Sequence, residues 1–328
     1  GILLLDLTQK AATLDVDPSY VYGLSSNIYI MLFSTLILSL LGVFIIHGTL
    51  DKKVSKTIVE EDERIVSRKA KHFTTLESFI MLALILYAIS PGLNGSGVLL
   101  GEGESYLEKL LNPNSPFYTG FALIVLAIMM ICSVIYGYVS GNIKDTSAYS
   151  VGLSKNFEGL GYVFVLLFFT AQMIGILEWT NLGVVVATNL VSFISSLSMT
   201  GILLIVLFFV VVIIMTILIP SAELKWGLAA PLIVPLLMRA NITPSFAQFI
   251  FRAADGVGKA MTPFFPYFLI MLAFLEKYNS KKEEKITISG TIKMILPSVL
   301  IFGALWILIL ICWYLMGLPT GVNVYPTF

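Results

Sequence analysis

The stretch from residue 219 to residue 268 constrains the fold more than any other part of this chain. It contains six prolines, three glycines and six charged residues inside a strongly apolar sequence. Charges are costly at membrane depth, and interrupted helices free backbone groups that lipid cannot satisfy. Such a stretch is stable only where it is buried in protein or lines a wet cavity, so we predict that it forms the functional site. Its charged residues are Glu223, Lys225, Arg239, Arg252, Asp255 and Lys259.

The composition of the whole chain is that of a polytopic membrane protein. Hydrophobic residues make up 57% of the 328 residues and charged residues only 12%, about half the charged share of a soluble domain. The formal net charge is zero, which argues against nucleic acid as a partner and leaves the lipid bilayer. Cys132 and Cys312 lie in apolar runs without metal-ligand or disulfide spacing. We therefore expect no metal site and no cofactor.

Apolar segments long enough to cross a bilayer recur along the chain. A span needs about twenty residues at about 1.5 Å per residue. Two other segments, 51–72 and 277–293, are rich in lysine and arginine, which marks them as cytoplasmic. We therefore predict a multi-pass protein of the cell (inner) membrane with both of these loops inside the cell. The uninterrupted spans are expected at 27–47, 74–90, 116–138, 157–177 and 294–316.

Two further apolar segments are interrupted. Segment 202–240 breaks at a proline–serine pair, which predicts a re-entrant hairpin with a polar tip. Segment 245–275 carries two glycines and a proline between Asp255 and Pro263, which predicts a helix broken over that interval. Segment 182–198 is too short and too polar for a span and is expected to be an interfacial helix.

The expected fold is thus all-α, with about six transmembrane helices when the broken helix is counted, plus one re-entrant hairpin. Half-helices that meet at mid-membrane are the architecture of secondary transporters, where helix ends and loose backbone groups face the substrate and ions. The hairpin tip and the helix break are therefore expected to meet across one cavity.

Three motifs in this part of the chain resemble the C-terminal half of the AbgT family. They are SAELKWGLAAPLIVP at 221–235, PSFAQFIFRAADG at 244–256 and TPFFPYF at 262–268. Supporting stretches are IYGYVSG at 135–141 and FFTAQMIGILEWTNLG at 168–183. The family contains p-aminobenzoyl-glutamate transporters and exporters of sulfonamide antimetabolites. The resemblance extends over the whole chain, which corresponds to the C-terminal two-thirds of a family member.

The resemblance implies part of an elevator-type transporter with two inverted repeats, usually a homodimer. Residues upstream of Gly1 are then expected in the full protein. The implied divisions are 1–26 as the remnant of the first repeat's broken helix with a connector, 27–138 as scaffold spans, 139–276 as the transport unit of the second repeat, and 277–328 as a cytoplasmic loop with the last span.

The resemblance also implies the site residues. Arg252 offers a planar guanidinium for a carboxylate such as the glutamate of a substrate, and Trp226 offers an aromatic face for an aryl ring. The implied substrate-binding residues are Ser221, Glu223, Trp226, Pro244, Arg252, Asp255 and Pro263. The implied ion-coupling residues are Asp255, Gly256, Lys259 and Thr262.

The chain departs from the family pattern where neutral oxygen donors suited to sodium are usual. It has Glu223 at the hairpin tip and Lys259 in the broken helix. We predict that Lys259 supplies the charge of a sodium ion by pairing with Asp255 or Glu223, so that a proton or no ion at all replaces sodium in coupling. The alternative is a static pair between Glu223 and Lys259 that only holds the two tips together.

The expected function is secondary active transport, by alternating access, of small carboxylate or aryl compounds similar to p-aminobenzoyl-glutamate or sulfonamides. One alternative is a degenerate or truncated membrane subunit that transports nothing. A more remote alternative is an intramembrane enzyme, which lacks support because both histidines lie outside the tips and neither GxSxG nor HExxH occurs.

Overall fold

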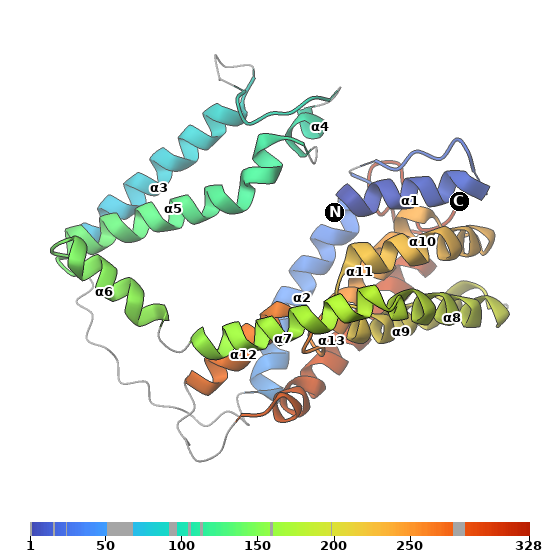
Figure 1. The fold of residues 1–328 in the computed structure, drawn as a ribbon. Helices are drawn as coiled ribbons and strands as arrows, with labels where there is room; N and C mark the ends of the chain where they lie inside the picture. The colour runs from blue at the N-terminus through green and yellow to red at the C-terminus, as the bar shows by residue number, and fades with distance from the viewer. Residues whose placement is uncertain are drawn as a thin grey trace. The chain divides into compact units, whose positions relative to one another are not determined.

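The computed structural model describes residues 2–15, 17–23, 25–50, 68–91, 97–103, 106–111, 114–157, 160–197, 199–277 and 286–328. These residues form helices and connecting segments, and their only β-type pairing is an isolated bridge between Gly321 and Val324. The helices are α1 (Ile2–Asp15), α2 (Ile28–Thr49), α3 (Arg68–Ile89), α4 (Tyr106–Leu111), α5 (Pro116–Ser140), α6 (Thr146–Phe157), α7 (Leu160–Trp179), α8 (Leu182–Ser196), α9 (Gly201–Leu218), α10 (Ala222–Arg239), α11 (Pro244–Lys259), α12 (Pro266–Lys277) and α13 (Ile288–Met316) (Figure 1).

The predicted all-α membrane fold with about six spans is confirmed. Five described helices are long and apolar enough to cross a membrane, namely α2, α3, α5, α9 and α13. Parts of α7 and α8 form a pair bent by 65°, which makes six if the pair is one span. Helix α8 covers most of the segment expected to be interfacial. Since α9 alone is long enough to span, the re-entrant character of the hairpin stays a prediction.

The predicted cytoplasmic loops cannot be compared with the structure in full. Residues 51–67 and 278–285 lie outside the described residues, so the orientation of both loops stays a prediction. The expected division into scaffold and transport unit concerns movement, and it also stays a prediction.

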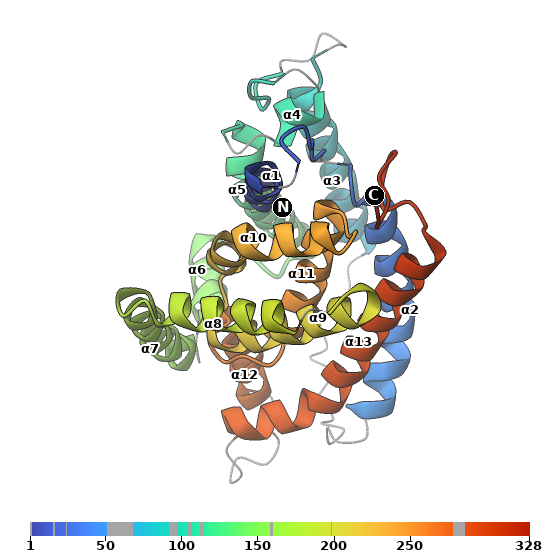
Figure 2. The same ribbon diagram turned by 90° about the vertical axis from the view of Figure 1, so that its right-hand side faces the viewer.

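The chain forms two compact units. The smaller one contains α3 to α6, and in it α3 lies along α5. Within this unit the Cys132 thiol donates to the Glu77 carboxylate at 2.8 Å. The larger unit contains α1, α2 and α7 to α13. In it α2 and α13 run side by side, while α11 lies against α9 (Figures 1 and 2).

The close contact between α9 and α11 depends on Gly258. A Cβ atom at this glycine would lie 2.6 Å from the Cβ of Thr216 and 3.2 Å from the carbonyl oxygen of Ile213. The expectation that the helix breaks from Asp255 onward is wrong at this boundary, because α11 continues to Lys259 and the break covers residues 260–265. A glycine costs a helix only about 1 kcal/mol, so close packing on α9 outweighs the propensity for a break.

Replacing Gly258 by valine is expected to destabilise the protein by about 1–3 kcal/mol, because an added side chain overpacks the contact with Thr216. The measurement is thermal unfolding of the full-length protein in detergent. Gly256→Ala is the matched control, since no atom lies within 4 Å of a Cβ added there. A Gly258→Val protein as stable as the control would contradict the packing role.

Candidate functional site

Two interruptions between consecutive helices lie next to each other in the larger unit. The first is the tip between α9 and α10, where the Ser221 hydroxyl accepts a hydrogen bond from the Leu224 N–H at 3.3 Å and so caps α10. The second is the break between α11 and α12. The buried Thr262 hydroxyl of this break donates to the Ile217 carbonyl at the end of α9, at 2.8 Å. This hydrogen bond holds the two breaks together.

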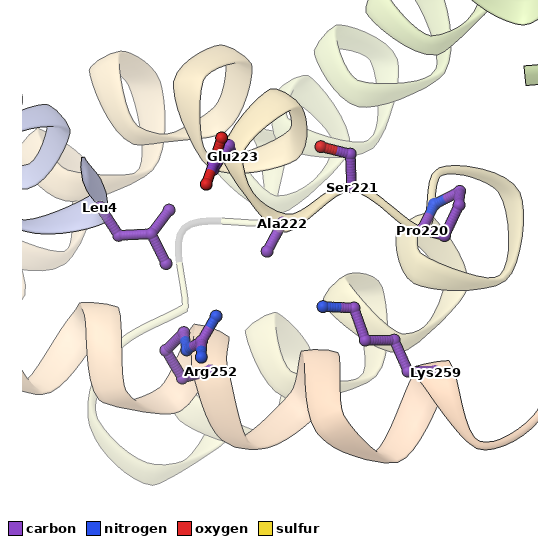
Figure 3. Close-up of a pocket in the computed structure, with 7 residues that line it drawn as sticks. All are labelled: Leu4, Pro220, Ser221, Ala222, Glu223, Arg252 and Lys259. Carbon is purple, nitrogen blue, oxygen red and sulfur yellow. The ribbon is translucent and has the colours of Figure 1, made fainter. Parts of the chain in front are cut away.

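A cavity of about 330 Å³ lies between the hairpin tip and α11. Helix α1 also contributes a wall residue. Arg252 and Lys259 are seven residues apart, so they project from one face of α11, and both point into the cavity while Glu223 and Ser221 lie on the opposite wall (Figure 3). The lining contains charged groups and a hydroxyl but no thiol or imidazole. The residues that line the cavity are Leu4, Pro220, Ser221, Ala222, Glu223, Arg252 and Lys259.

Behind one wall of the cavity, Asp255 is held by two lysines. Asp255 is only 2% exposed to solvent. One carboxylate oxygen contacts Lys225 Nζ, and the other contacts Lys259 Nζ at 2.8 Å. Thr216 Oγ1 accepts a hydrogen bond from Lys225 at 2.7 Å and lies 3.3 Å from the carboxylate. Both oxygens of Asp255 therefore contact ammonium groups. The two lysines and the one carboxylate together carry a net charge of +1.

The two lysines of this cluster differ in their access to the cavity. The Lys225 side chain is completely buried, with its ammonium group 5.9 Å from the centre of the Phe251 ring. The Lys259 side chain is 21% exposed and lines the cavity. Buried charges are stable only when they are paired. We conclude that Lys225 pairs with Asp255 away from the cavity, while Lys259 pairs with the same carboxylate and also faces the cavity.

Lys225 is one of the charged residues of the stretch 219–268, but it was not among the residues predicted to bind substrate or couple ions. It is buried in α10 directly before the buried Trp226. A lysine in an apolar segment requires a carboxylate partner, which was the signal that could have identified it. The alternative pair between Glu223 and Lys259 is not formed. In the described part of the chain, Lys259 pairs with Asp255 and Glu223 has no ion-pair partner.

Trp226 does not line the cavity in this structure. It is completely buried, and its ring centre lies 4.5 Å from that of Phe251. Its indole N–H donates to the Thr8 hydroxyl of α1 at 2.9 Å, and that hydroxyl donates to the Leu4 carbonyl at 2.7 Å. The tryptophan therefore fixes α10 against α1, and its predicted contact with an aryl ring is not available in this conformation.

Pro244 lies at the opposite end of α11 from the cavity. It occupies the first turn of the helix, fifteen residues from Lys259, or about 22 Å along the axis. Its neighbour Thr243 donates its backbone N–H to the Pro326 carbonyl of the C-terminal segment at 2.9 Å. The Ser245 N–H donates to the hydroxyl of Tyr20, whose pKa is raised by burial. This end of α11 is an anchor rather than a cavity wall.

The structure thus separates the predicted site residues into three groups. Ser221, Glu223, Arg252 and Lys259 line the cavity. Asp255 lies behind the wall in contact with Lys259. Trp226, Pro244, Gly256, Thr262 and Pro263 do not belong to the lining. Their predicted roles in substrate binding and ion coupling stay predictions.

Comparison with known proteins places the sequence in a family. The sequence model of the AbgT putative transporter family matches residues 1–328. The p-aminobenzoyl-glutamate transport protein of Escherichia coli (strain K12) is 26% identical to the chain over 331 residues, which cover 99% of this chain and 62% of that protein.

Two solved structures are also similar. The YdaH transporter of Alcanivorax borkumensis, described as having an unusual topology, matches with a TM-score of 0.52 and 27% identity over 97% of this chain and 65% of that one. MtrF of Neisseria gonorrhoeae, described as illuminating a class of antimetabolite efflux pumps, matches with a TM-score of 0.49 and 25% identity over 98% of this chain and 63% of that one. The chain therefore spans less than two-thirds of each of these relatives.

Proposed function

Because this chain belongs to the AbgT putative transporter family, we propose that it contains the substrate site of a secondary active transporter for small carboxylate-bearing aryl compounds. Substrates would be similar to p-aminobenzoyl-glutamate or to sulfonamides. The observation that carries this proposal is the Arg252 side chain, which faces the cavity without an ion-pair partner among the described residues. A guanidinium binds a carboxylate through two parallel hydrogen bonds.

The interruptions between α9 and α10 and between α11 and α12 support the proposal that this site moves by alternating access. In secondary transporters, discontinuous helices meet around the substrate, and their ends supply the groups that bind it. Here the N-terminal end of α10 and the C-terminal end of α11 both border the cavity. A homodimer in the inner membrane, with the lysine-rich loops in the cytoplasm, belongs to the same proposal.

Lys259 is proposed to act as a tethered cation in place of sodium. Asp255 is the only buried acid among the residues whose burial is described, and ammonium groups occupy both of its oxygens. A sodium ion needs several oxygen ligands, as hard cations do, and a sodium ion at this carboxylate would lie beside two ammonium groups of like charge. Transport coupled to a proton, or exchange without a coupling ion, is compatible with this arrangement.

Lys259→Asn is expected to make transport dependent on sodium. Asparagine removes the tethered charge and supplies a neutral oxygen, so the rate without sodium should fall by roughly 10–100-fold, equivalent to losing a hydrogen bond to a charged group of about 1.5–3 kcal/mol. A sodium gradient should restore part of the rate. The measurement is uptake and efflux of radiolabelled p-aminobenzoyl-glutamate in proteoliposomes that contain the full-length protein.

The control is Lys10→Asn, which removes an exposed lysine from a surface pair with Asp6 and should leave the rate unchanged. Strict sodium dependence of the wild-type protein would refute the substitution of lysine for sodium. A wild-type protein that neither binds nor transports the compound would refute this substrate and favour the non-transporting subunit.

A further inference from the structure

Two side chains of opposite charge face the cavity from opposite walls and remain unpaired. Arg252 projects from α11 and Glu223 from the first turn of α10 (Figure 3). In the part of the chain that the structure describes, neither Glu223 nor Arg252 forms an ion pair. Glu223 and Arg252 therefore lie too far apart for a salt bridge, although they share one cavity.

This arrangement suits a ligand that carries both signs of charge. A carboxylate would bind the Arg252 guanidinium, and an ammonium group at the other end would bind the Glu223 carboxylate. A ligand with a carboxylate at each end would place like charge beside Glu223, which is unfavourable. Resting on the proposed function, we infer that the cavity takes an amphoteric compound and that Glu223 selects a cationic amino group at the end opposite the carboxylate.

The charge balance around the cavity agrees with this ligand. Lys225, Lys259 and Arg252 are three cations, and Asp255 and Glu223 are two carboxylates, which leaves one positive charge. A compound with two carboxylates and one ammonium group would neutralise this excess. Acylated glutamates with a free aliphatic amino group belong to this class.

A purely structural role of Glu223, as an acid at the start of α10, predicts a different result. A carboxylate in the first turn of a helix is stabilised by the helix dipole by about 0.3–1 kcal/mol. If that were its only role, its removal would lower stability slightly and leave the preference among ligands unchanged. The test therefore measures preference.

The experiment compares three probes that share the glutamate end, bound to the full-length protein in detergent. They are p-(aminomethyl)benzoyl-glutamate with an ammonium group, p-aminobenzoyl-glutamate with a neutral amine, and benzoyl-glutamate with no amine. The wild-type protein is expected to bind the first about tenfold more tightly than the third. Glu223→Gln should abolish this preference, because benzoyl-glutamate then binds at least as tightly as before.

Two further variants complete the test. Glu223→Asp keeps the charge and should keep a preference for the ammonium compound. Glu276→Gln, at an exposed acid near the end of α12, should keep the wild-type order. The inference is overturned if wild-type protein shows no preference, if Glu223→Gln keeps it, or if none of the probes binds.

Transport in proteoliposomes separates this inference from the proposed function. Transport of p-aminobenzoyl-glutamate together with a preference that Glu223→Gln does not alter would leave the proposed function standing and overturn the inference. The expected preference in binding without any transport would support the inference and overturn the proposed transport.

Discussion

Asp255→Asn is expected to destabilise the full-length protein by about 3–5 kcal/mol, because it leaves a buried ammonium group without its counter-charge. The Lys225 side chain is completely buried, and besides Asp255 its hydrogen-bond partner is the neutral Thr216 hydroxyl. Lys259 contributes less to this cost, since its side chain is 21% exposed and can turn toward the cavity.

The measurement is equilibrium or thermal unfolding of the purified protein in detergent. Adding Lys225→Met to Asp255→Asn should recover most of the lost stability, because replacing a buried ion pair by apolar groups of similar volume is often neutral. Asp6→Asn is the control, and loss of this exposed pair with Lys10 should cost at most about 1 kcal/mol. An Asp255→Asn protein as stable as the control would show that Lys225 does not depend on this carboxylate.

Arg252→Gln is expected to weaken binding of p-aminobenzoyl-glutamate by roughly 10–100-fold, which corresponds to loss of about 1.5–3 kcal/mol from a charged hydrogen bond. The affinity of Arg252→Lys should lie between those of the wild-type protein and Arg252→Gln, because an ammonium group keeps the charge but loses the planar two-point contact. The free energy of unfolding should hardly change, since the Arg252 side chain is exposed to the cavity and has no ion-pair partner among the described residues.

The dissociation constant of the radiolabelled compound checks this prediction. Lys10→Gln removes an exposed cation from α1 and should bind as the wild-type protein does, which separates a specific contact from a general loss of positive charge. Unchanged affinity in Arg252→Gln would mean that the carboxylate binds elsewhere, and the substrate site would then have to be reassigned.

The sequence by itself determined the class of the fold and the break between α9 and α10, whereas it placed the start of the break after α11 several residues too early. The predicted hairpin arms begin and end within a few residues of α9 and α10, because apolar length and proline are local properties of a chain in a membrane. The charges in the stretch 219–268 predicted that it forms the site, and the family resemblance implied that Glu223 and Arg252 bind substrate there. A charge needs water or a partner wherever it lies, so charged residues in an apolar chain identify a site before any fold is known.

Only the tertiary structure decided which groups meet. Position 258 needs a glycine because Thr216 leaves no room for a side chain. The buried indole N–H of Trp226 is satisfied by Thr8, which lies 218 residues away in the sequence. The partner of Lys225 is Asp255, thirty residues further along the chain. Packing density and the pairing of buried charges depend on neighbours that are distant in sequence. For this reason local sequence patterns could locate the site but could not distinguish the residues that line the cavity from the buried residues that pack behind them.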